Sequence, residues 1–282
     1  MSGFDPAWLD LREPADHAAR SAEVLAAVAA DFAGPEEVVV ADLGSGSGST
    51  LRALAPHLGP RQRWRLIDHD PALLAHARAR LSAWADAATD DDGVLRLTRE
   101  GQEIAVETFA LDLSADPLPE AARFADLVSA SALFDLVGEA WLRGFVGALA
   151  AARRPLYAAL SYDGATRFTP AHPSDLAVVA AFNRHQQTDK GLGPALGPEA
   201  AETLTRRLQG QECETVVGAS PWRLGWRETE LTSELVAGMA RAVAELPDPP
   251  AGLDGWLAFR TEFAGVRVEV GHLDLYARPA RR

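Results

Sequence analysis

An acidic residue followed by alternating glycines is the part of this sequence best suited to chemistry. Asp42 lies at the end of an apolar, β-branched run over 38–43, and Gly44, Gly46 and Gly48 follow it. Glycine has no Cβ, so glycines at alternate positions let the backbone turn tightly and let a ligand approach it. The pattern predicts a strand that ends in a nucleotide-binding loop.

The spacing of the glycines indicates which nucleotide this loop binds. The dinucleotide fingerprint needs a glycine where this chain has Ser49, and Asp42 would repel a pyrophosphate. The carboxylate can instead accept a hydrogen bond from a cationic amino group. The segment resembles the first motif of the class I S-adenosylmethionine-dependent methyltransferases, in which an acid precedes a Gly-x-Gly-x-Gly loop around the methionine moiety. The resemblance implies S-adenosyl-L-methionine as cofactor and S-adenosyl-L-homocysteine as product.

Further acids stand at the ends of later predicted strands. Asp68 follows the loop by about twenty residues, the separation at which a carboxylate at the end of the second strand accepts the ribose hydroxyls. With His69 it lies in the segment Asp68–Pro71, which resembles the second motif of the same family. The resemblance also implies that Asp112 accepts from the adenine amino group and that the backbone of Leu113 meets the ring. Both acids could instead cap helices.

Two more features complete the predicted cofactor site. Ser129 begins a run of small residues over 129–132, which would leave room for a sulfonium beside the sheet. Arg12 or Arg20 could neutralise the methionine carboxylate, and we favour Arg20 because a surface salt bridge is the better expectation for Arg12. The predicted cofactor-binding residues are Arg20, Asp42, Gly44, Gly46, Gly48, Asp68, His69, Asp112, Leu113 and Ser129.

Strands and helices alternate through the first part of the chain. We expect helices over 15–33, from about 50 to 55, over 71–84 with Asp70 as N-cap, and over 139–152. We expect strands over 37–43, 65–67, 104–111, 126–131 and 156–162, and a solvated turn at Asp90–Gly93. This alternation predicts an α/β fold with a Rossmann-like, doubly wound, mostly parallel sheet, whose ligand crevice lies at the carboxyl ends of the strands.

The alternation stops after Gly164. Residues 165–200 are rich in proline and glycine, and the stretch 182–187 is too polar for a core helix, so we expect a lid inserted after the fifth strand. Helices over 198–209, 230–246 and 253–263 and strands over 213–217 and 266–276 bring the sheet to seven strands. We expect one domain over 1–282, made of an N-terminal helical cover (1–35), a cofactor-binding core (36–163), a lid or substrate segment (164–210) and C-terminal strands and helices (211–282).

Candidates for catalysis lie at the end of the fifth strand and in the lid. A base is needed only if the accepting atom is protonated at the working pH. His185 is preferred because imidazole titrates near neutrality, and Tyr162 and Asp163 are further catalytic candidates. The remaining candidates for the base in this region are His172, Asn183 and Asp189. Trp222 and Trp226 could stack on an aromatic acceptor or pack in the core.

Composition limits the partners. The 282 residues carry a net charge of −13 with a single lysine, which argues against nucleic acid, as does the absence of a proline-bearing tetrapeptide after the fourth strand. No apolar stretch is long enough to cross a membrane. Scattered histidines and one cysteine, Cys213, give no metal site. The single cysteine and the absence of a visible signal sequence at the N-terminus favour the cytoplasm.

These features predict methyl transfer to an O or N atom of a small molecule by in-line displacement. One alternative is a non-catalytic sensor or scaffold that binds the same nucleoside. An NAD(P)-dependent oxidoreductase is less favoured because the third glycine of its fingerprint is missing. A hydrolase could use Ser47, in Gly-x-Ser-x-Gly, with Asp163 and His272. The expected partner is a small-molecule acceptor, and the oligomeric state stays open, with a homodimer as one expectation.

Overall fold

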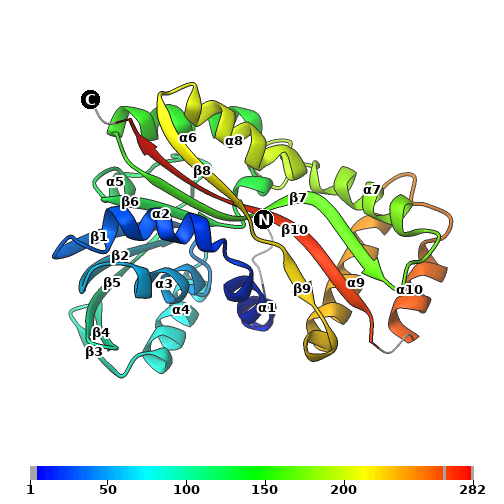
Figure 1. The fold of residues 1–282 in the computed structure, drawn as a ribbon, viewed down its shortest axis with the longest axis horizontal. Helices are drawn as coiled ribbons and strands as arrows, with labels where there is room; N and C mark the ends of the chain where they lie inside the picture. Colours follow the sequence, from blue (N-terminus) through cyan, green and yellow to red (C-terminus); the bar gives the residue numbers. More distant parts are fainter. Residues whose placement is uncertain (1–4, 263–264, 281–282) are drawn as a thin grey trace.

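A single sheet runs through the molecule (Figure 1). The computed structural model describes residues 5–262 and 265–280, and within them the sheet has ten strands in the order β3-β4-β5-β2-β1-β6-β7-β10-β8, with β9 paired to β10. The seven central strands are β1 (Glu37–Leu43), β2 (Arg61–Asp68), β5 (Gln102–Ala110), β6 (Leu127–Ser131), β7 (Leu156–Thr169), β10 (Arg267–Pro279) and β8 (Cys213–Ala219).

The central strands have the predicted Rossmann-like arrangement. β1 pairs in parallel with β2 and with β6, β2 with β5, and β6 with β7. Only β10 runs against its two neighbours, β7 and β8. The strand order reverses between β1 and β6, and in sheets of this type a ligand crevice forms beyond the strand ends at that point. The predicted fold class is therefore confirmed.

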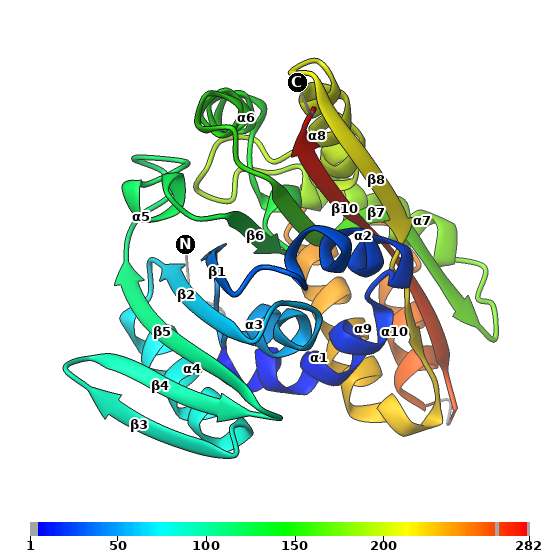
Figure 2. The same ribbon diagram turned by 60° about the vertical axis from the view of Figure 1, so that its left-hand side comes forward.

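An edge hairpin extends the sheet beyond the seven predicted strands. β3 (Ala87–Asp91) and β4 (Val94–Arg99) pair in antiparallel fashion next to β5, at the edge away from β8 (Figure 2). The turn between them has left-handed backbone at Asp92 and Gly93, the usual geometry of a two-residue hairpin. The prediction of a turn at Asp90–Gly93 is thus right for Asp92 and Gly93 only, because Asp90 and Asp91 belong to β3.

The N-terminal helix is interrupted. The structure has α1 (Pro6–Ala19) and α2 (Ala22–Phe32) where we predicted one helix over 15–33, so that prediction is wrong. Ser21 is the N-cap of α2 and its hydroxyl accepts from the Val24 amide, which starts a new helix. The expectation that the N-terminus carries no signal sequence rests largely on residues 1–4, which lie outside the described residues.

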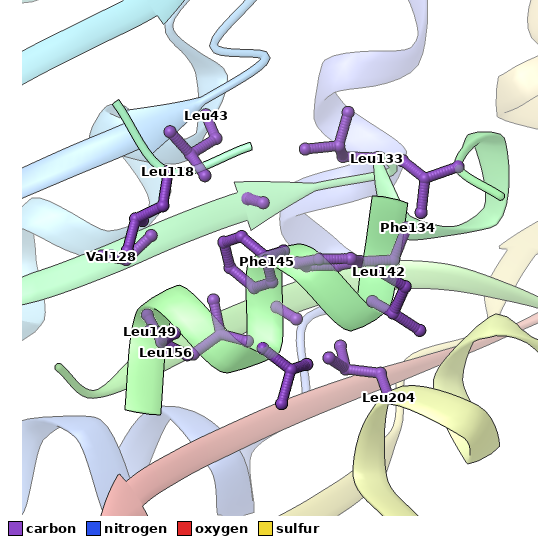
Figure 3. Close-up of a cluster of buried hydrophobic side chains, with 14 of the residues drawn as sticks. Leu43, Leu118, Val128, Leu133, Phe134, Leu142, Phe145, Leu149, Leu156 and Leu204 are labelled. Atoms are coloured by element: carbon purple, nitrogen blue, oxygen red, sulfur yellow. The ribbon is translucent and has the colours of Figure 1, made fainter. Parts of the chain in front are cut away.

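Helices cover both faces of the sheet. α2, α3 (Ser49–Leu54) and α4 (Pro71–Trp84) pack on one face, and α5 (Glu120–Arg123), α6 (Glu139–Ala152) and α8 (Ala200–Gln209) on the other. Each face thus has its own hydrophobic core. Figure 3 shows the core on the α6 face, where Phe145 and Leu149 of α6 lie near Val128 of β6 and Leu156 of β7. Trp141 stacks on Phe145 at a centroid distance of 5.5 Å. Burial of these apolar faces fixes the strand tips relative to one another.

A third core surrounds the long ends of β7 and β10. These strands stay paired as far as Thr169 and Arg267, and α7 (Asp175–Gln186), α9 (Thr229–Ala244), α10 (Leu253–Glu262) and β9 (Trp222–Leu224) gather around them (Figure 1). Residues 182–186 form the last turns of α7, but its buried residues, Val178 and Ala181, precede them, and no residue of the polar stretch 182–187 is fully buried. Residue 263 of the helix predicted over 253–263 lies outside the described residues.

Among the described helices, none is long and apolar enough to cross a membrane.

A buried carboxylate joins the break between α1 and α2 to the sheet. Asp274 of β10 is fully buried, and its oxygens accept from the backbone amides of Ser21 and Leu160, each at 2.9 Å. Leu160 has a left-handed backbone (φ 55°), which makes β7 irregular at this point. The charge of Arg20 balances the carboxylate. This contact places α1 over the carboxyl ends of the strands.

Replacing Asp274 should destabilise the protein strongly. The change Asp274→Ala leaves the buried amides of Ser21 and Leu160 without their acceptor and removes the charge that balances the buried Arg20 guanidinium, so we expect a loss of about 3–5 kcal/mol in the free energy of unfolding. Urea denaturation measures it. The control Asp92→Asn, at an exposed turn, should stay within about 0.5 kcal/mol of the wild type. A loss below about 1 kcal/mol for Asp274→Ala would contradict the role of this carboxylate.

Candidate functional site

The loop after β1 is shaped by its glycines. Gly44 (φ 61°) and Gly48 (φ 75°) have left-handed backbone, which costs a residue with a Cβ more than it costs glycine. A Cβ at Gly46 would lie 3.3 Å from Leu9 of α1, so the loop and the helix are in close contact. The loop is also tied to the tip of β2, because the Ser45 amide donates to Ile67 O at 3.1 Å.

The helix α1 is clamped onto this loop by a buried ion pair. Both nitrogens Nε and Nη2 of Arg52 donate to the Glu13 carboxylate, at 2.6 and 2.5 Å, and Nη1 donates to the Ser47 carbonyl at 3.0 Å. Burial alone would raise the pKa of Glu13, but the hydrogen bond and charge of Arg52 outweigh it and lower that pKa. His17 adds a contact to the Ser49 hydroxyl at 3.0 Å.

One pocket lies at the carboxyl ends of the parallel strands, at the reversal of strand order. Its floor is the loop after β1, and its sides come from the segments after β2, β5 and β6, from α1 and from the segment after α7. Six predicted cofactor residues line it, namely Gly44, Gly46, Asp68, His69, Asp112 and Leu113. The structure thus brings together side chains that are far apart in the sequence.

The other four predicted cofactor residues do not line the pocket. Gly48 is the N-cap of α3 and faces Ala77 of α4. Asp42 and Ser129 lie fully buried beneath the floor. Arg20 is buried too, and its guanidinium donates to the Tyr157 hydroxyl and to the hydroxyl of Ser131. Since Ser131 lines the pocket, Arg20 supports the wall rather than facing the cavity.

Asp42 is held in an unfavourable state. Its Oδ1 accepts from the Ser129 hydroxyl at 2.7 Å, while Oδ2 makes no hydrogen bond of standard geometry with the described residues. Burial raises the pKa of Asp42 to about 7, and the nearby charge of Asp68 adds to the rise. A buried carboxylate oxygen without a donor is costly, so this side chain is suited to a donor that arrives with a ligand.

The two acids in the pocket wall also hold the backbone around them. Asp68 accepts from the Gly46 amide at 2.9 Å and from the Asp70 amide at 3.0 Å. Asp112 accepts from the amide and the hydroxyl of Ser114, each at 2.8 Å, and these bonds lower its pKa. Each carboxylate oxygen can accept a second hydrogen bond, so both acids can still take a ligand donor.

Arg12, not Arg20, is the arginine in the pocket. It pairs with Asp16 through Nε to Oδ2 at 2.9 Å and Nη2 to Oδ1 at 3.1 Å, and both residues line the cavity. The expectation of a surface salt bridge is wrong, because the two side chains are only 14% and 9% exposed. Trp222 packs against the Arg12 guanidinium at 5.0 Å and donates its indole N–H to Asp16.

The catalytic candidates lie outside the pocket lining. His185 of α7 pairs with Glu245 of α9 at 3.0 Å. Tyr162 is buried, with its hydroxyl on Asn183 at 2.8 Å, and burial raises its pKa to about 12. Asp163 accepts from the Ala165 amide. The geometry therefore gives no support to these three residues as groups that reach a ligand in this pocket. His172 and Asp189 also lie outside it, and Trp226 is 74% exposed.

The residues proposed for a hydrolase do not form a triad. Ser47 belongs to the loop, and its carbonyl accepts from Arg52. His272 of β10 packs its ring against Trp222 and Tyr162, at 5.3 and 6.2 Å. None of the hydrogen bonds among the described residues joins Ser47, His272 and Asp163.

Sequence reasoning missed several residues of the pocket. Leu9 and Asp16 were missed because α1 begins at Pro6, and a proline at position 14 hides the helical pattern. Ser131 was named only as a small residue at the end of the fourth strand. Leu192, the one lining residue from the segment after α7, has no local signal, because only the fold brings it to the cavity.

Comparisons with known proteins identify the fold. The sequence matches no family model and no curated protein. Among solved structures, the YcgJ protein from Bacillus subtilis is 11% identical with a TM-score of 0.50, over 92% of this chain and 99% of its own. A cyclopropane-fatty-acyl-phospholipid synthase-like protein from Lactobacillus casei is 14% identical with a TM-score of 0.53, over 96% and 94%. A SAM-dependent methyltransferase from Thiobacillus denitrificans reaches 15% identity and a TM-score of 0.47, over 99% of both chains.

The chain shares the Rossmann-like fold of the first two of these solved structures. At these identities the likeness concerns the fold, and activity must be argued from the pocket.

The raised pKa of Asp42 makes stability depend on pH. An acid whose pKa is about 7 when folded and 3.8 when unfolded holds its proton more tightly in the folded state, so stability falls as the pH rises from about 4 to 7. The change Asp42→Asn removes this penalty, and we expect it to raise the free energy of unfolding at pH 8 by about 1–3 kcal/mol. Urea denaturation at pH 5 and pH 8 measures the difference. Asp92→Asn should keep the wild-type pH dependence, and a less stable Asp42→Asn protein at pH 8 would contradict the prediction.

Proposed function

We propose that this chain transfers a methyl group from S-adenosyl-L-methionine to an N or O atom of a small molecule. The observation that carries the proposal is the convergence of the glycine loop, Asp68 and Asp112 on one pocket, with the partnerless oxygen of Asp42 beneath its floor. These groups suit the parts of the cofactor. Asp42 can accept from the cationic amino group of the methionine moiety. Asp68 can accept from the ribose hydroxyls, and Asp112 can accept from the adenine amino group.

The polar groups of the pocket fit this cofactor better than a dinucleotide. Asp42 lies beneath the loop, and its carboxylate disfavours a pyrophosphate at this place. Arg12 lines the pocket and can pair with the carboxylate of the methionine moiety. The hydroxyl of Ser45 is a second buried polar group without a partner among the described residues. We propose that the methionine end lies over the glycine loop, with Arg12 near its carboxylate and Asp42 near its amino group.

The protein's part in the reaction is alignment and exclusion of water. When bound, the cofactor supplies an activated methyl group, and the sulfur keeps the bonding electron pair as the acceptor's lone pair forms the new bond. Leu9, Leu133, Leu136 and Leu192 give the pocket apolar walls, which keep water from the accepting atom. Ser131, held by Arg20, fixes the corner after β6.

Titration calorimetry with S-adenosyl-L-homocysteine tests the cofactor. We expect binding with a dissociation constant well below about 1 mM, and the change Asp68→Asn should weaken it by about 10–100-fold, because it removes a charge-assisted acceptor from the wall. Asp92→Asn should bind as the wild type does. No binding of S-adenosyl-L-methionine or S-adenosyl-L-homocysteine below about 1 mM would overturn the proposal.

A turnover assay distinguishes a methyltransferase from a non-catalytic protein that binds the same cofactor. Incubation with methyl-labelled S-adenosyl-L-methionine and small-molecule pools should release S-adenosyl-L-homocysteine, and Asp68→Asn should lower that release. Tight binding without release in any pool would instead identify a non-catalytic binding protein.

A further inference from the structure

The turn after α7 carries the one lysine of the sequence. Lys190 belongs to this turn, and Leu192, two positions later, lines the pocket. The turn closes on itself, because Asp189 and Pro194 form an antiparallel bridge. Lys190 is itself partly buried and is not among the residues that line the pocket. The cofactor site therefore does not use its amine.

Lys190 is the first of three polar side chains that contact one another in a row. Its Nζ lies 3.4 Å from Nδ1 of His185, which belongs to the last turn of α7. The other ring nitrogen of His185, Nε2, lies 3.0 Å from a carboxylate oxygen of Glu245, which caps the end of α9. An amine, a base within reach of it and an acid that orients the base form the arrangement that activates a nucleophilic side chain.

The contacts of this row suit two positions of one proton. An ammonium group has only donors, so a charged Lys190 requires His185 to accept at Nδ1 and to donate at Nε2 to Glu245. When the proton passes from Nζ to Nδ1, the imidazolium donates to both neighbours and the free amine accepts. The transfer loses no hydrogen bond, and the carboxylate of Glu245 offsets the new charge on His185. The geometry therefore lets Lys190 give up a proton and present a lone pair.

The surroundings of the row favour the free amine. The His185 side chain is only 14% exposed, whereas that of Glu245 is 72% exposed. Burial lowers the pKa of Lys190, and the charge of Glu245 acts in the opposite direction without cancelling the effect. A partly buried lysine beside a base is a better nucleophile near neutral pH than a lysine in open solvent.

We propose that Lys190 is an acylation site, with His185 as its base and acyl thioesters as the donors. An amide forms only if the nitrogen loses protons, and His185 can take one of them. A thioester is activated without carrying charge, whereas an acyl phosphate, or the carbamate formed from carbon dioxide, would add a negative charge near Glu245. The inference goes beyond the proposed function and does not depend on it.

The acyl transfer conserves atoms and charge. The Lys190 ammonium passes one proton to His185, and the lone pair on Nζ then forms a bond to the carbonyl carbon of the thioester. The carbon–sulfur bond breaks, and the sulfur keeps the electron pair, takes a second proton from the nitrogen and leaves as a thiol. His185 then returns its proton to water. The product is a neutral amide, so Lys190 has lost the charge that faced His185.

Acetyl transfer from a small thioester tests the site. The protein would be incubated with S-acetyl-N-acetylcysteamine at pH 7.5, and acetylation of Lys190 followed by peptide mass spectrometry. An N-acetylated synthetic peptide of residues 187–193 has the same lysine without the fold. We expect Lys190 of the protein to react about 10-fold or more faster than the lysine of the peptide. Because the sequence has no second lysine, the only other amine is at the N-terminus, and it is measured on a different peptide.

Loss and rescue test the base. The change His185→Ala should slow the acetylation of Lys190 about 10-fold or more. Added imidazole should then restore the rate by a larger factor than it changes the rate of the synthetic peptide, because imidazole can occupy the place of the lost ring. A merely structural role of His185 would show no such rescue. Asp92→Asn is the matched control and should react as the wild type does.

Each result decides a stated part of the inference. If Lys190 of the protein reacts no faster than the peptide, the acylation site is overturned. If His185→Ala reacts like the wild type, or imidazole accelerates it no more than the peptide, the assignment of the base is overturned. If His185→Ala does not fold, the comparison of the wild type with the peptide decides alone.

Discussion

The pocket depends on how two buried carboxylates, Asp68 and Glu13, hold the glycine-rich loop after β1. Asp68 accepts from the Gly46 amide on one side, and Glu13 holds Arg52, whose guanidinium reaches the Ser47 carbonyl, on the other. Glycines give the loop its left-handed turns but add conformational freedom, which the folded state must remove. Charge-assisted hydrogen bonds in a buried setting are strong enough to fix such a loop in one conformation.

The same contacts explain why α1 is part of the pocket rather than a separate cover. Glu13 and His17 face the loop, while Arg12 and Asp16 face the cavity and Trp222. One helix thus joins the Rossmann-like sheet to the third core around β7, β9 and β10. The strand tips supply the acids on one side of the pocket, and this helix supplies the cation on the other.

Much of the fold and part of the site followed from local sequence. β-branched runs gave the parallel strands, Asp70 and Pro71 gave the start of α4, and the acids at strand ends gave Asp68 and Asp112. The break at Arg20–Ser21 could not be read, because it depends on Asp274, a partner 253 residues away from Ser21. The choice between Arg12 and Arg20 failed for the same reason, since only tertiary packing decides which guanidinium faces the cavity. His185 was preferred for its titration range, and α7 carries it to α9 instead.

The wall that α1 forms has a consequence for the order of folding. Its contacts join residues very distant along the chain, since the Trp222 indole bonds Asp16 across 206 positions and Asp274 bonds Ser21 across 253. Closing such long loops is slow, because their entropy is lost before the contacts form. α1 is made before β10, yet its residues and Ser21 reach their final place only after β9 and β10 have been made. Ligand binding is therefore among the last properties that a newly made chain acquires.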